Sequence, residues 1–205
     1  SNDQLEDIIT FPELGGIRMS SEQFKERIQM MYYKVFEVLI NQMMIYNDDI
    51  WDSLTKEDRD QHWEFRRESF YTIISTYEIL GSDLLNHIFS SLKQQVEIFC
   101  NSSGSNWREL EIIISILRVL AEHIDFSSVN QGTTGYDALL QILDSNVLKC
   151  IESVQSAKHP DLTLIIKNST SNLICEYSEW FSYTNNPGLL DGVLDYLVNM
   201  ICQPK

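Results

Sequence analysis

The stretch EWFSYTNNPGLLDGVLDYLVNMI, residues 179–201, contains two apolar runs separated by a short polar break. The first run ends before Asn185, and the second begins at Leu189 with the spacing of one helix face. Asn186 and Pro187 lie between them, and the helical spacing restarts after this pair. The stretch therefore predicts two helices joined by a tight turn, each with an apolar face.

Composition favours helices throughout the chain. The 205 residues include 43% hydrophobic residues, enough for a sizeable core, but only 8 glycines and 4 prolines. Long Leu- and Ile-rich stretches without Gly or Pro are typical of an all-helical protein. No apolar run is long enough for a membrane span, so no membrane insertion is expected. The chain begins Ser1-Asn2 without an initiator methionine or a signal peptide, and we expect a fragment of a longer intracellular protein.

The chain is strongly acidic. Thirty Asp and Glu residues against fifteen Lys and Arg residues give a formal net charge of −15. Such a surface repels nucleic acid and anionic lipid and attracts basic proteins, so we expect no direct nucleic-acid binding. The alternative is the ordinary acidic surface of a soluble cytoplasmic protein. Four widely spaced cysteines without a CxxC pair are interpreted as reduced core thiols: Cys100, Cys150, Cys175 and Cys202.

Apolar spacing predicts seven helices. The stripes cover residues 24–43, 65–80, 84–99, 110–124, 139–154, 162–181 and 189–201. Capping-box spacings mark three starts: Ser20 with Gln23, Thr55 with Asp58, and Asn106 with Glu109. Gly81 and Ser82 are expected to end one helix and cap the next. The acidic stretch NDDIWDS (47–53) and the polar stretch 125–135 are predicted to be loops.

After the first helix, the predicted segments group into three antiparallel pairs. Their starts give units of about 50 residues, and a period near 40–50 residues with two helices indicates HEAT or armadillo repeats. One pair cannot bury its own stripes, so neighbouring pairs stack into a continuous core. We therefore predict an all-α HEAT-repeat α-solenoid of about seven helices, with residues 20–205 as one segment. Residues 1–19 are predicted to be a loop or the remnant of a preceding repeat, and a four-helix bundle with extra helices is the competing fold.

No pattern in the sequence indicates an enzyme, a metal site or a cofactor site. The histidines form no HExxH motif, and the stretch EHID (122–125) lies at a helix end, where histidine is favourable beside the last carbonyls. No glycine-rich phosphate loop and no GxSxG elbow occur. A helical enzyme with a pocket between helices is kept as an alternative from another functional class.

Aromatic and basic residues are assigned mainly structural roles. Aromatic residues on or beside the stripes are interpreted mostly as core anchors: Trp63, Phe65, Trp107, Trp180 and Phe181. Basic residues in an acid-rich helix are expected to pair within that helix: Lys56, Arg59, Arg66 and Arg67.

Acidic residues recur between the apolar positions of the second helices in the later pairs: Asp137, Asp144, Glu152, Asp191 and Asp195. One face of every pair in a solenoid is concave, so acids repeated along it would add up to an extended negative field that attracts a basic partner. The alternative is an ordinary solvated face.

Three stretches resemble repeat units of the importin-β superfamily of nuclear transport receptors, in particular the branch of importin-13 and transportin-3. FRRESFYTIISTYEILGSDLLNHIFSSL (65–92) has an Arg-containing start, a Tyr-Glu-x-Leu-Gly elbow and a Leu-rich second helix. NWRELEIIISILRVLAEHID (106–125) and EYSEWFSYTNNPGLLDGVLDYLVNMICQP (176–204) resemble the following units. The resemblance covers roughly residues 20–204.

This resemblance implies a central HEAT-repeat fragment of a transport receptor that shuttles between cytoplasm and nucleus without doing chemistry. It implies basic protein cargo on the concave second helices, which makes the five acids named above candidate contacts. It also implies Ran-GTP and nucleoporins as partners of the full-length protein, although the main Ran-binding region of such receptors lies nearer their N-terminal repeats. Loop 125–135 is longer than a typical elbow, and either mobility or a partner contact would explain it. A HEAT-repeat scaffold or adaptor outside nuclear transport is the second hypothesis.

Overall fold

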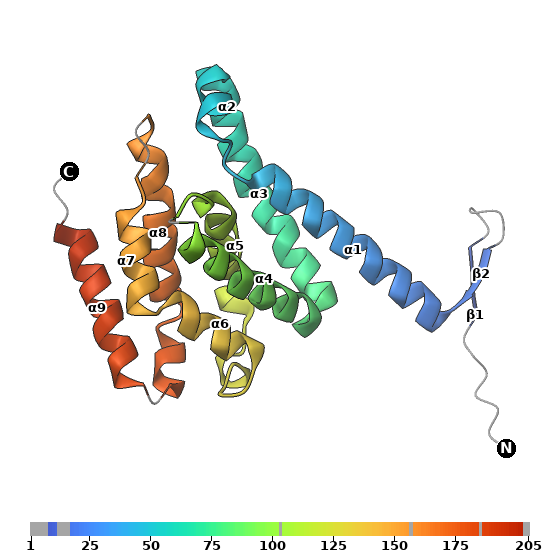
Figure 1. The fold of residues 1–205 in the computed structure, drawn as a ribbon. Helices are drawn as coiled ribbons and strands as arrows, with labels where there is room; N and C mark the ends of the chain where they lie inside the picture. Colours follow the sequence, from blue (N-terminus) through green and yellow to red (C-terminus); the bar gives the residue numbers. More distant parts are fainter. Residues whose placement is uncertain (1–7, 12–16, 103, 156–157, 185, 203–205) are drawn as a thin grey trace.

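The computed structural model describes residues 8–11, 17–102, 104–155, 158–184 and 186–202 (Figure 1). Its α-helices are α1 Ser21–Met43, α2 Asp48–Ser53, α3 Lys56–Leu80, α4 Ser82–Asn101, α5 Trp107–Leu120, α6 Thr134–Ile142, α7 Ser145–Ser153, α8 Pro160–Glu176 and α9 Pro187–Cys202. Three short 3₁₀ helices are η2 Ala121–His123, η3 Phe126–Ser128 and η4 Glu179–Tyr183. Two strands, β1 Ile8–Phe11 and β2 Ile17–Ser20, precede the helices.

Reciprocal side-chain caps start α1 and α3 where the sequence predicts them. The Ser20 hydroxyl accepts from the Gln23 backbone N–H, and the Gln23 side chain accepts from the Ser20 N–H, both at 3.2 Å. Thr55 and Asp58 make the same pair of hydrogen bonds at 3.1 and 3.0 Å. These bonds satisfy backbone donors that have no carbonyl partner in the first turn, so both predicted capping boxes are confirmed.

Two other predicted caps are wrong. Ser82 lies inside α4, while Gly81, with φ of 57°, both ends α3 and precedes α4 without a side-chain cap. Positive φ favours glycine, which explains the residue at this elbow. The Asn106 side chain does not cap α5 either, because it donates to the Gln95 side chain and accepts from the Ser102 hydroxyl. Asn106 therefore ties the loop to α4.

A β-hairpin occupies part of the segment that we predicted to be a loop or a helical remnant. β1 pairs antiparallel with β2, with Ile8 opposite Ser20 and Phe11 opposite Ile17. The β1 residues, Ile-Ile-Thr-Phe, are β-branched or aromatic and favour strands. The prediction from helical spacing did not take this preference into account. Residues 1–7 and 12–16 of that prediction lie outside the described residues. Helices make up the remaining regular structure of the described chain.

The helices pack in pairs that form two layers (Figure 1). The first-helix layer contains α3, α5 and α8, in which α5 contacts both neighbours. The second-helix layer contains α4, α6, α7 and α9, in which α4 packs on α6 and α7 packs on α9. α1 packs on α3, and it lies at the opposite end of the array from α9 (Figure 1). This paired, layered arrangement is consistent with the predicted α-solenoid.

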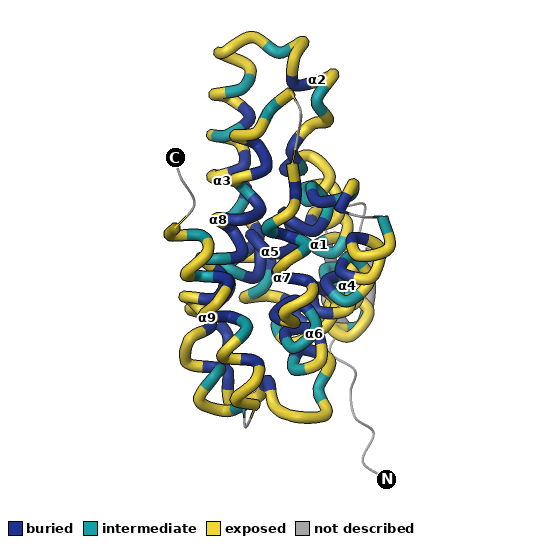
Figure 2. Tube along the Cα trace, turned by 60° about the vertical axis from the view of Figure 1, so that its left-hand side comes forward, coloured by how far each residue is buried: buried dark blue, intermediate teal, exposed yellow. Residues whose placement is uncertain are grey.

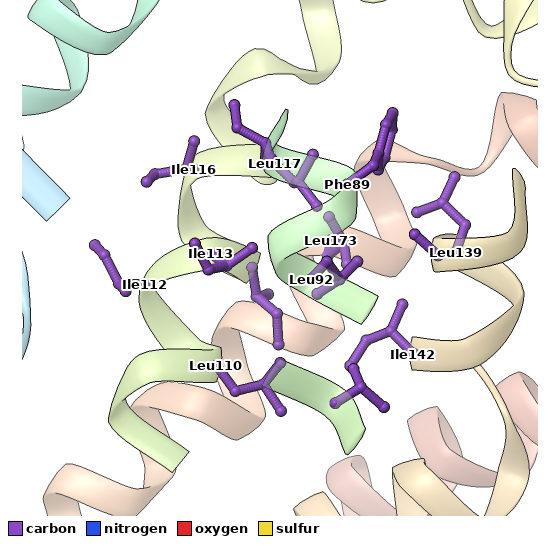
Figure 3. Close-up of a cluster of buried hydrophobic side chains, with 14 of the residues drawn as sticks. Phe89, Leu92, Leu110, Ile112, Ile113, Ile116, Leu117, Leu139, Ile142 and Leu173 are labelled. Carbon is purple, nitrogen blue, oxygen red and sulfur yellow. The ribbon is translucent and has the colours of Figure 1, made fainter. Parts of the chain in front are cut away.

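The core lies between the two layers, and exposed positions lie on their outer sides (Figure 2). Figure 3 shows side chains from several helices meeting there. All of the following are at most 5% exposed: Phe89 and Leu92 of α4, Leu110, Ile113 and Leu117 of α5, Leu139 and Ile142 of α6, and Leu173 of α8. Because no single pair supplies this cluster, each pair depends on its neighbours for burial.

The predicted helix over residues 139–154 is two helices. α6 ends at Ile142, and the Asp144 carboxylate accepts from the Asn146 N–H at 2.9 Å and caps α7. A side chain that bonds the backbone in this way competes with helix continuation, which the apolar spacing alone does not reveal. The next predicted stripe also divides, because α8 ends at Glu176 and η4 carries Trp180 and Phe181.

The acidic stretch 47–53 is a short helix instead of the predicted loop. The Asn47 side chain accepts from the Ile50 N–H at 3.0 Å and caps α2. Residues of α5 and of the segment before α8 pair with its carboxylates. Arg108 binds Asp48, Lys158 binds Asp49 and lies 3.7 Å from Asp52, and the His159 ring hydrogen-bonds to Asp52. The hydrogen bond from Lys158 holds the pKa of Asp49 below its usual value. The carboxylates of α2 are therefore paired within the chain.

A buried ion pair joins α3 to α5. The guanidinium of Arg66 contacts both carboxylate oxygens of Glu111 at 2.8 Å, and it also donates to the Met43 carbonyl of α1 at 2.8 Å. The hydroxyls of Ser115 and Ser169 donate to the same carboxylate at 2.6 and 3.0 Å. The Glu111 side chain has no exposed surface, and these donors compensate its buried charge.

The basic residues of α3 follow the intrahelical prediction only in part. Arg67 pairs with Glu64 and Glu68 on the exposed face of α3, as predicted. Arg66 does not, because it points between helices and binds Glu111, so that prediction is wrong. Arg59 donates to the Trp51 carbonyl of α2 at 2.8 Å.

Four of the five aromatic residues belong to the core. Trp107 and Trp180 are buried, and Trp63 and Phe181 are partly buried against the core, whereas Phe65 is 38% exposed. The Trp180 indole N–H donates to the Val129 carbonyl at 2.9 Å. This bond anchors loop 125–135 to the core, together with the ring contact of Phe126 with Tyr177. Part of the predicted loop is also helical, because η3 covers Phe126–Ser128 and α6 begins at Thr134.

The prediction that the cysteines are core residues is wrong for three of the four, whereas Cys150 packs against the core. All four thiols are free, but Cys100, Cys175 and Cys202 are exposed and Cys150 is partly buried. The three exposed cysteines lie in the last turns of α4, α8 and α9 on faces turned away from the core.

Arg66→Ala should lower the free energy of unfolding by about 3–5 kcal/mol, because it leaves the Glu111 carboxylate buried without its counter-ion. Arg67→Ala is the matched control, since the Arg67 side chain is 65% exposed and its loss should cost less than about 0.5 kcal/mol. Urea unfolding followed by circular dichroism measures both values. Equal losses would contradict the buried pairing.

Trp180→Ala should cost about 3–5 kcal/mol, because it empties a fully buried site and removes the anchor of loop 125–135. Phe65→Ala, at an exposed ring, should change stability by less than about 1 kcal/mol. Thermal unfolding compares the two variants. An unchanged melting temperature for Trp180→Ala would exclude this residue from the core.

Candidate functional site

The five acids predicted to bind a partner all belong to the second-helix layer. Asp137 is on α6, Asp144 precedes α7, Glu152 is on α7, and Asp191 and Asp195 are on α9. Two grooves between these helices gather four of the five, and Asp191 lines neither groove. The structure places the acids on one layer, and their binding to a partner stays a prediction.

The first groove lies between α4 and the α6–α7 segment and has a volume of about 680 Å³. Its lining residues are Lys93, Val96, Glu97, Cys100, Asn101, Asp137, Leu140, Gln141, Asp144 and Val147. Lys93 lies 3.8 Å from the Asp137 carboxylate, and the two side chains are 39% and 56% exposed. One lysine faces three acids here, so the groove carries a net negative charge.

Glu97 is the acid of the first groove that the sequence analysis did not single out. It lies on α4 between the buried residues Val96 and Phe99, the same pattern that identified the acids on α6, α7 and α9. α4 is the second helix of its own pair. The pattern of acids between apolar positions of second helices, applied to α4, therefore identifies Glu97 as well.

Asp144 has a structural role besides its place in the groove. Its carboxylate caps α7, where the partial positive charge of a helix N-terminus favours an anion. The cap alone is therefore sufficient to explain an acidic residue at this position. Asp144 still adds negative charge at the end of the groove, since its side chain remains exposed.

The second groove lies between α7 and α9 and has a volume of about 260 Å³. Its lining residues are Ser145, Leu148, Lys149, Glu152, Gly188, Gly192, Asp195, Tyr196 and Asn199. Glu152 accepts from the Asn199 side-chain amide at 3.3 Å. A Cβ atom at Gly192 would lie 3.2 Å from the Cβ of Ser145, so glycine allows α9 to approach α7 this closely.

The outer side of α9 combines acids with an apolar stripe. Asp191 and Asp195 are exposed one turn apart. Four apolar side chains beside them are 44–83% exposed: Leu190, Leu194, Val198 and Ile201. A helix in a stack normally buries such a stripe against the next helix, so α9 presents an unfilled packing face.

The described residues offer no metal site, since no group of three or more His, Cys, Asp or Glu side chains is placed to hold an ion. His123, in the EHID stretch, is exposed in η2. None of the described helices has the length and apolar character that crossing a membrane requires. The chemistry that the grooves do offer is the attraction of positively charged groups to carboxylates.

Comparison with known proteins relates the chain weakly to importin-13. No family model matches the sequence. The chain is 20% identical over 184 residues to importin-13 from Homo sapiens and from Bos taurus, and 23% identical over 185 residues to importin-13 from Gallus gallus. These alignments cover 89% of this chain but only 17% of the relatives. The similarity is that of an importin-β-like fragment.

Asp144→Ala should lower the free energy of unfolding by about 1 kcal/mol, because it removes the cap of α7. Asp144→Asn should keep nearly full stability, since asparagine caps helices about as well as aspartate. Asp191→Ala, at an exposed position, should change stability by less than about 0.5 kcal/mol. Urea unfolding of the three variants would reject the capping role of Asp144 if its Asn and Ala variants lost equal stability.

Proposed function

We propose that this chain is a central HEAT-repeat segment of an importin-13-like nuclear transport receptor and that its second-helix layer binds basic protein cargo. The observation that carries the proposal is the gathering of groove acids on consecutive helices of one layer. The similarity to importin-13 over 89% of the chain supports the receptor assignment.

The two grooves together carry more carboxylates than cations. They share α7, and their acids extend from Glu97 on α4 to Asp195 on α9. Carboxylates of one sign along a surface raise the local concentration of an oppositely charged partner and speed its association. An extended basic segment that crosses α7 would place cations over both grooves. The two cations present, Lys93 and Lys149, do not cancel this charge.

The mode of action that we propose is reversible binding without chemistry. In the whole receptor, we expect Ran-GTP to change the affinity for cargo, nucleoporins to bind during passage, and the protein to move between cytoplasm and nucleus. These properties belong to the longer protein, because the chain spans 17% of the length of its relatives.

A HEAT-repeat scaffold outside nuclear transport is the second candidate. The observation that favours it is that prominent residues of the resembling stretches, including Arg66, Trp107 and Trp180, are buried packing residues. A scaffold built from the same repeats would share them. Recovery of partners by the full-length protein with and without Ran-GTP distinguishes the two, since only a transport receptor is expected to exchange partners with Ran-GTP.

Asp191→Lys combined with Asp195→Lys should weaken the binding of a synthetic Lys/Arg-rich peptide about tenfold at low salt, an effect of about 1.4 kcal/mol from two reversed charges. The loss should shrink as salt rises, because the screening length falls from about 10 Å at 0.1 M to about 3 Å at 1 M. Fluorescence anisotropy with the labelled peptide measures the affinity.

Glu26→Lys combined with Glu37→Lys is the matched control for charge. Both residues are exposed on α1, away from the grooves, and the pair changes the net charge by the same amount. Binding should remain near that of the unmodified chain apart from a small general effect. Equal losses in the two double variants would show that net charge alone attracts the peptide.

A further inference from the structure

A pocket of about 460 Å³ lies at the α1 end of the array, opposite α9 (Figure 1). Four residues of α3 line it with the spacing of one helix face: Asp58, Gln61, His62 and Phe65. The last turn of α1 adds Gln42, and the segment between α1 and α2 adds Tyr46. None of these residues lines either acidic groove, so the pocket is a separate concave surface.

His62 brings an unpaired ring nitrogen to this pocket. Its side chain is 6% exposed, and its Nε2 atom is buried without a hydrogen-bond partner among the described residues. Burial and the charge of Arg66 lower the pKa of His62, so the imidazole is neutral at neutral pH. In the tautomer that carries its proton on Nδ1, Nε2 offers a lone pair. Because a buried polar atom without a partner costs free energy, a ligand that donates a hydrogen bond to Nε2 would be stabilised there.

The Tyr46 ring covers the His62 ring from the side of the pocket. The two ring centroids are 4.7 Å apart, and Tyr46 is 38% exposed. The Tyr46 backbone is held in place, because its carbonyl accepts from the Arg108 side chain at 3.0 Å. The exposed ring can therefore turn away from His62 without emptying a core site. A ligand that displaces it reaches Nε2 and gains an aromatic face to stack on.

We propose that this pocket binds the guanidinium group of an arginine side chain. Asp58 supplies the opposite charge, the exposed rings of Tyr46 and Phe65 stack on the guanidinium plane, and Nε2 of His62 accepts one of its N–H groups. A guanidinium is planar, permanently charged and carries five N–H donors, so it can make all three contacts at once. Assignment of this arginine to a cargo protein rests on the proposed function, whereas the pocket itself does not.

Asp58 remains available to a ligand although it caps α3. The backbone N–H and the hydroxyl of Thr55 both donate to Oδ2 of Asp58, which leaves Oδ1 to accept from a ligand. These hydrogen bonds lower the pKa of Asp58, so its carboxylate is ionised at neutral pH. The cap also fixes the side chain, so the charge is already oriented before a ligand arrives.

The arginines of α3 on either side of His62 are engaged elsewhere. Arg66 is paired with the buried Glu111 carboxylate. Arg59 donates to the Trp51 carbonyl and lies over the Trp51 ring, 5.3 Å from its centroid. Neither arginine is among the residues that line the pocket, and no described lysine lines it either. The charge inside the pocket is therefore that of Asp58.

Titration of the full chain with N-acetyl-arginine amide tests the site, followed by the imidazole proton signals in NMR spectra. The Cε1–H signal of His62, identified by its loss in His62→Gln, should shift and reach saturation. N-acetyl-citrulline amide, which has a similar shape without the charge, should bind about fivefold more weakly. Equal affinity for the two compounds, or a His62 signal that does not shift, would overturn the proposal.

Asp58→Asn removes the charge while keeping an oxygen that can accept from Thr55, and it should weaken binding of the arginine compound about fivefold. Asp60→Asn is the matched control, since Asp60 is exposed on the same helix outside the pocket, and it should leave the affinity unchanged. Circular dichroism checks that both variants fold. Equal losses in the two variants would show that general charge attracts the compound and would overturn the site.

The link to cargo is tested with the Lys/Arg-rich peptide. Asp58→Asn should weaken its binding about fivefold and should have less effect on an all-lysine version, because an ammonium group cannot stack and bond as a guanidinium does. If the arginine compound binds but Asp58→Asn leaves the peptide affinity unchanged, the cargo role of the pocket is overturned and the arginine site stands. If the unmodified chain binds the arginine compound but not the peptide, the proposed cargo binding fails and the site again stands.

Discussion

The charge of Glu111 is the constraint on which the arrangement of the helices depends. A carboxylate with no exposed surface must be compensated by donors from the chain itself, and here these are Arg66, Ser115 and Ser169. They come from α3, α5 and α8, and Arg66 also binds the Met43 carbonyl at the end of α1. Hydrogen bonds are directional, so this cluster fixes the relative positions of four helices more narrowly than apolar contacts would.

The two layers are consequently built in different ways. Among the described residues, every buried polar or charged residue belongs to α3, α5 or α8: His62, Arg66, Ser69, Thr76, Glu111, Ser115, Thr163, Lys167, Ser169 and Thr170. The second-helix layer buries apolar side chains, such as Leu92, Leu139 and Val193. Polar pairing therefore specifies the position of the first-helix layer, and apolar stripes attach the second-helix layer to it. The exposed carboxylates of Asp137, Asp191 and Asp195 belong to this second-helix layer.

Apolar periodicity can be recognised in the sequence, whereas long-range polar pairing cannot, and this explains which features could be predicted. Each of the seven apolar stripes lies mainly on helices because periodic apolar residues are what the core buries, and the caps at Ser20 and Thr55 act within one turn. The partner of Arg66 lies 45 residues away, so local spacing suggested an intrahelical pair instead. The break at Asp144 was missed because buried residues continue in register on both sides of it. The five acids could be placed on one layer, but their distribution between two grooves depends on how α4, α7 and α9 pack.

The first-helix layer is fixed by buried polar pairs and the second-helix layer by apolar stripes, and this contrast affects which groove residues the fold itself requires. Buried residues such as Arg66 and Trp180 are constrained by packing. Of the groove acids, only Asp144 has a contact that the fold requires, its cap on α7. Glu97, Asp137 and Asp195 are exposed, so packing does not require their charge, and Lys93 lies near Asp137. Exposed acids recur on successive second helices, and the proposed binding of a basic partner would account for that recurrence.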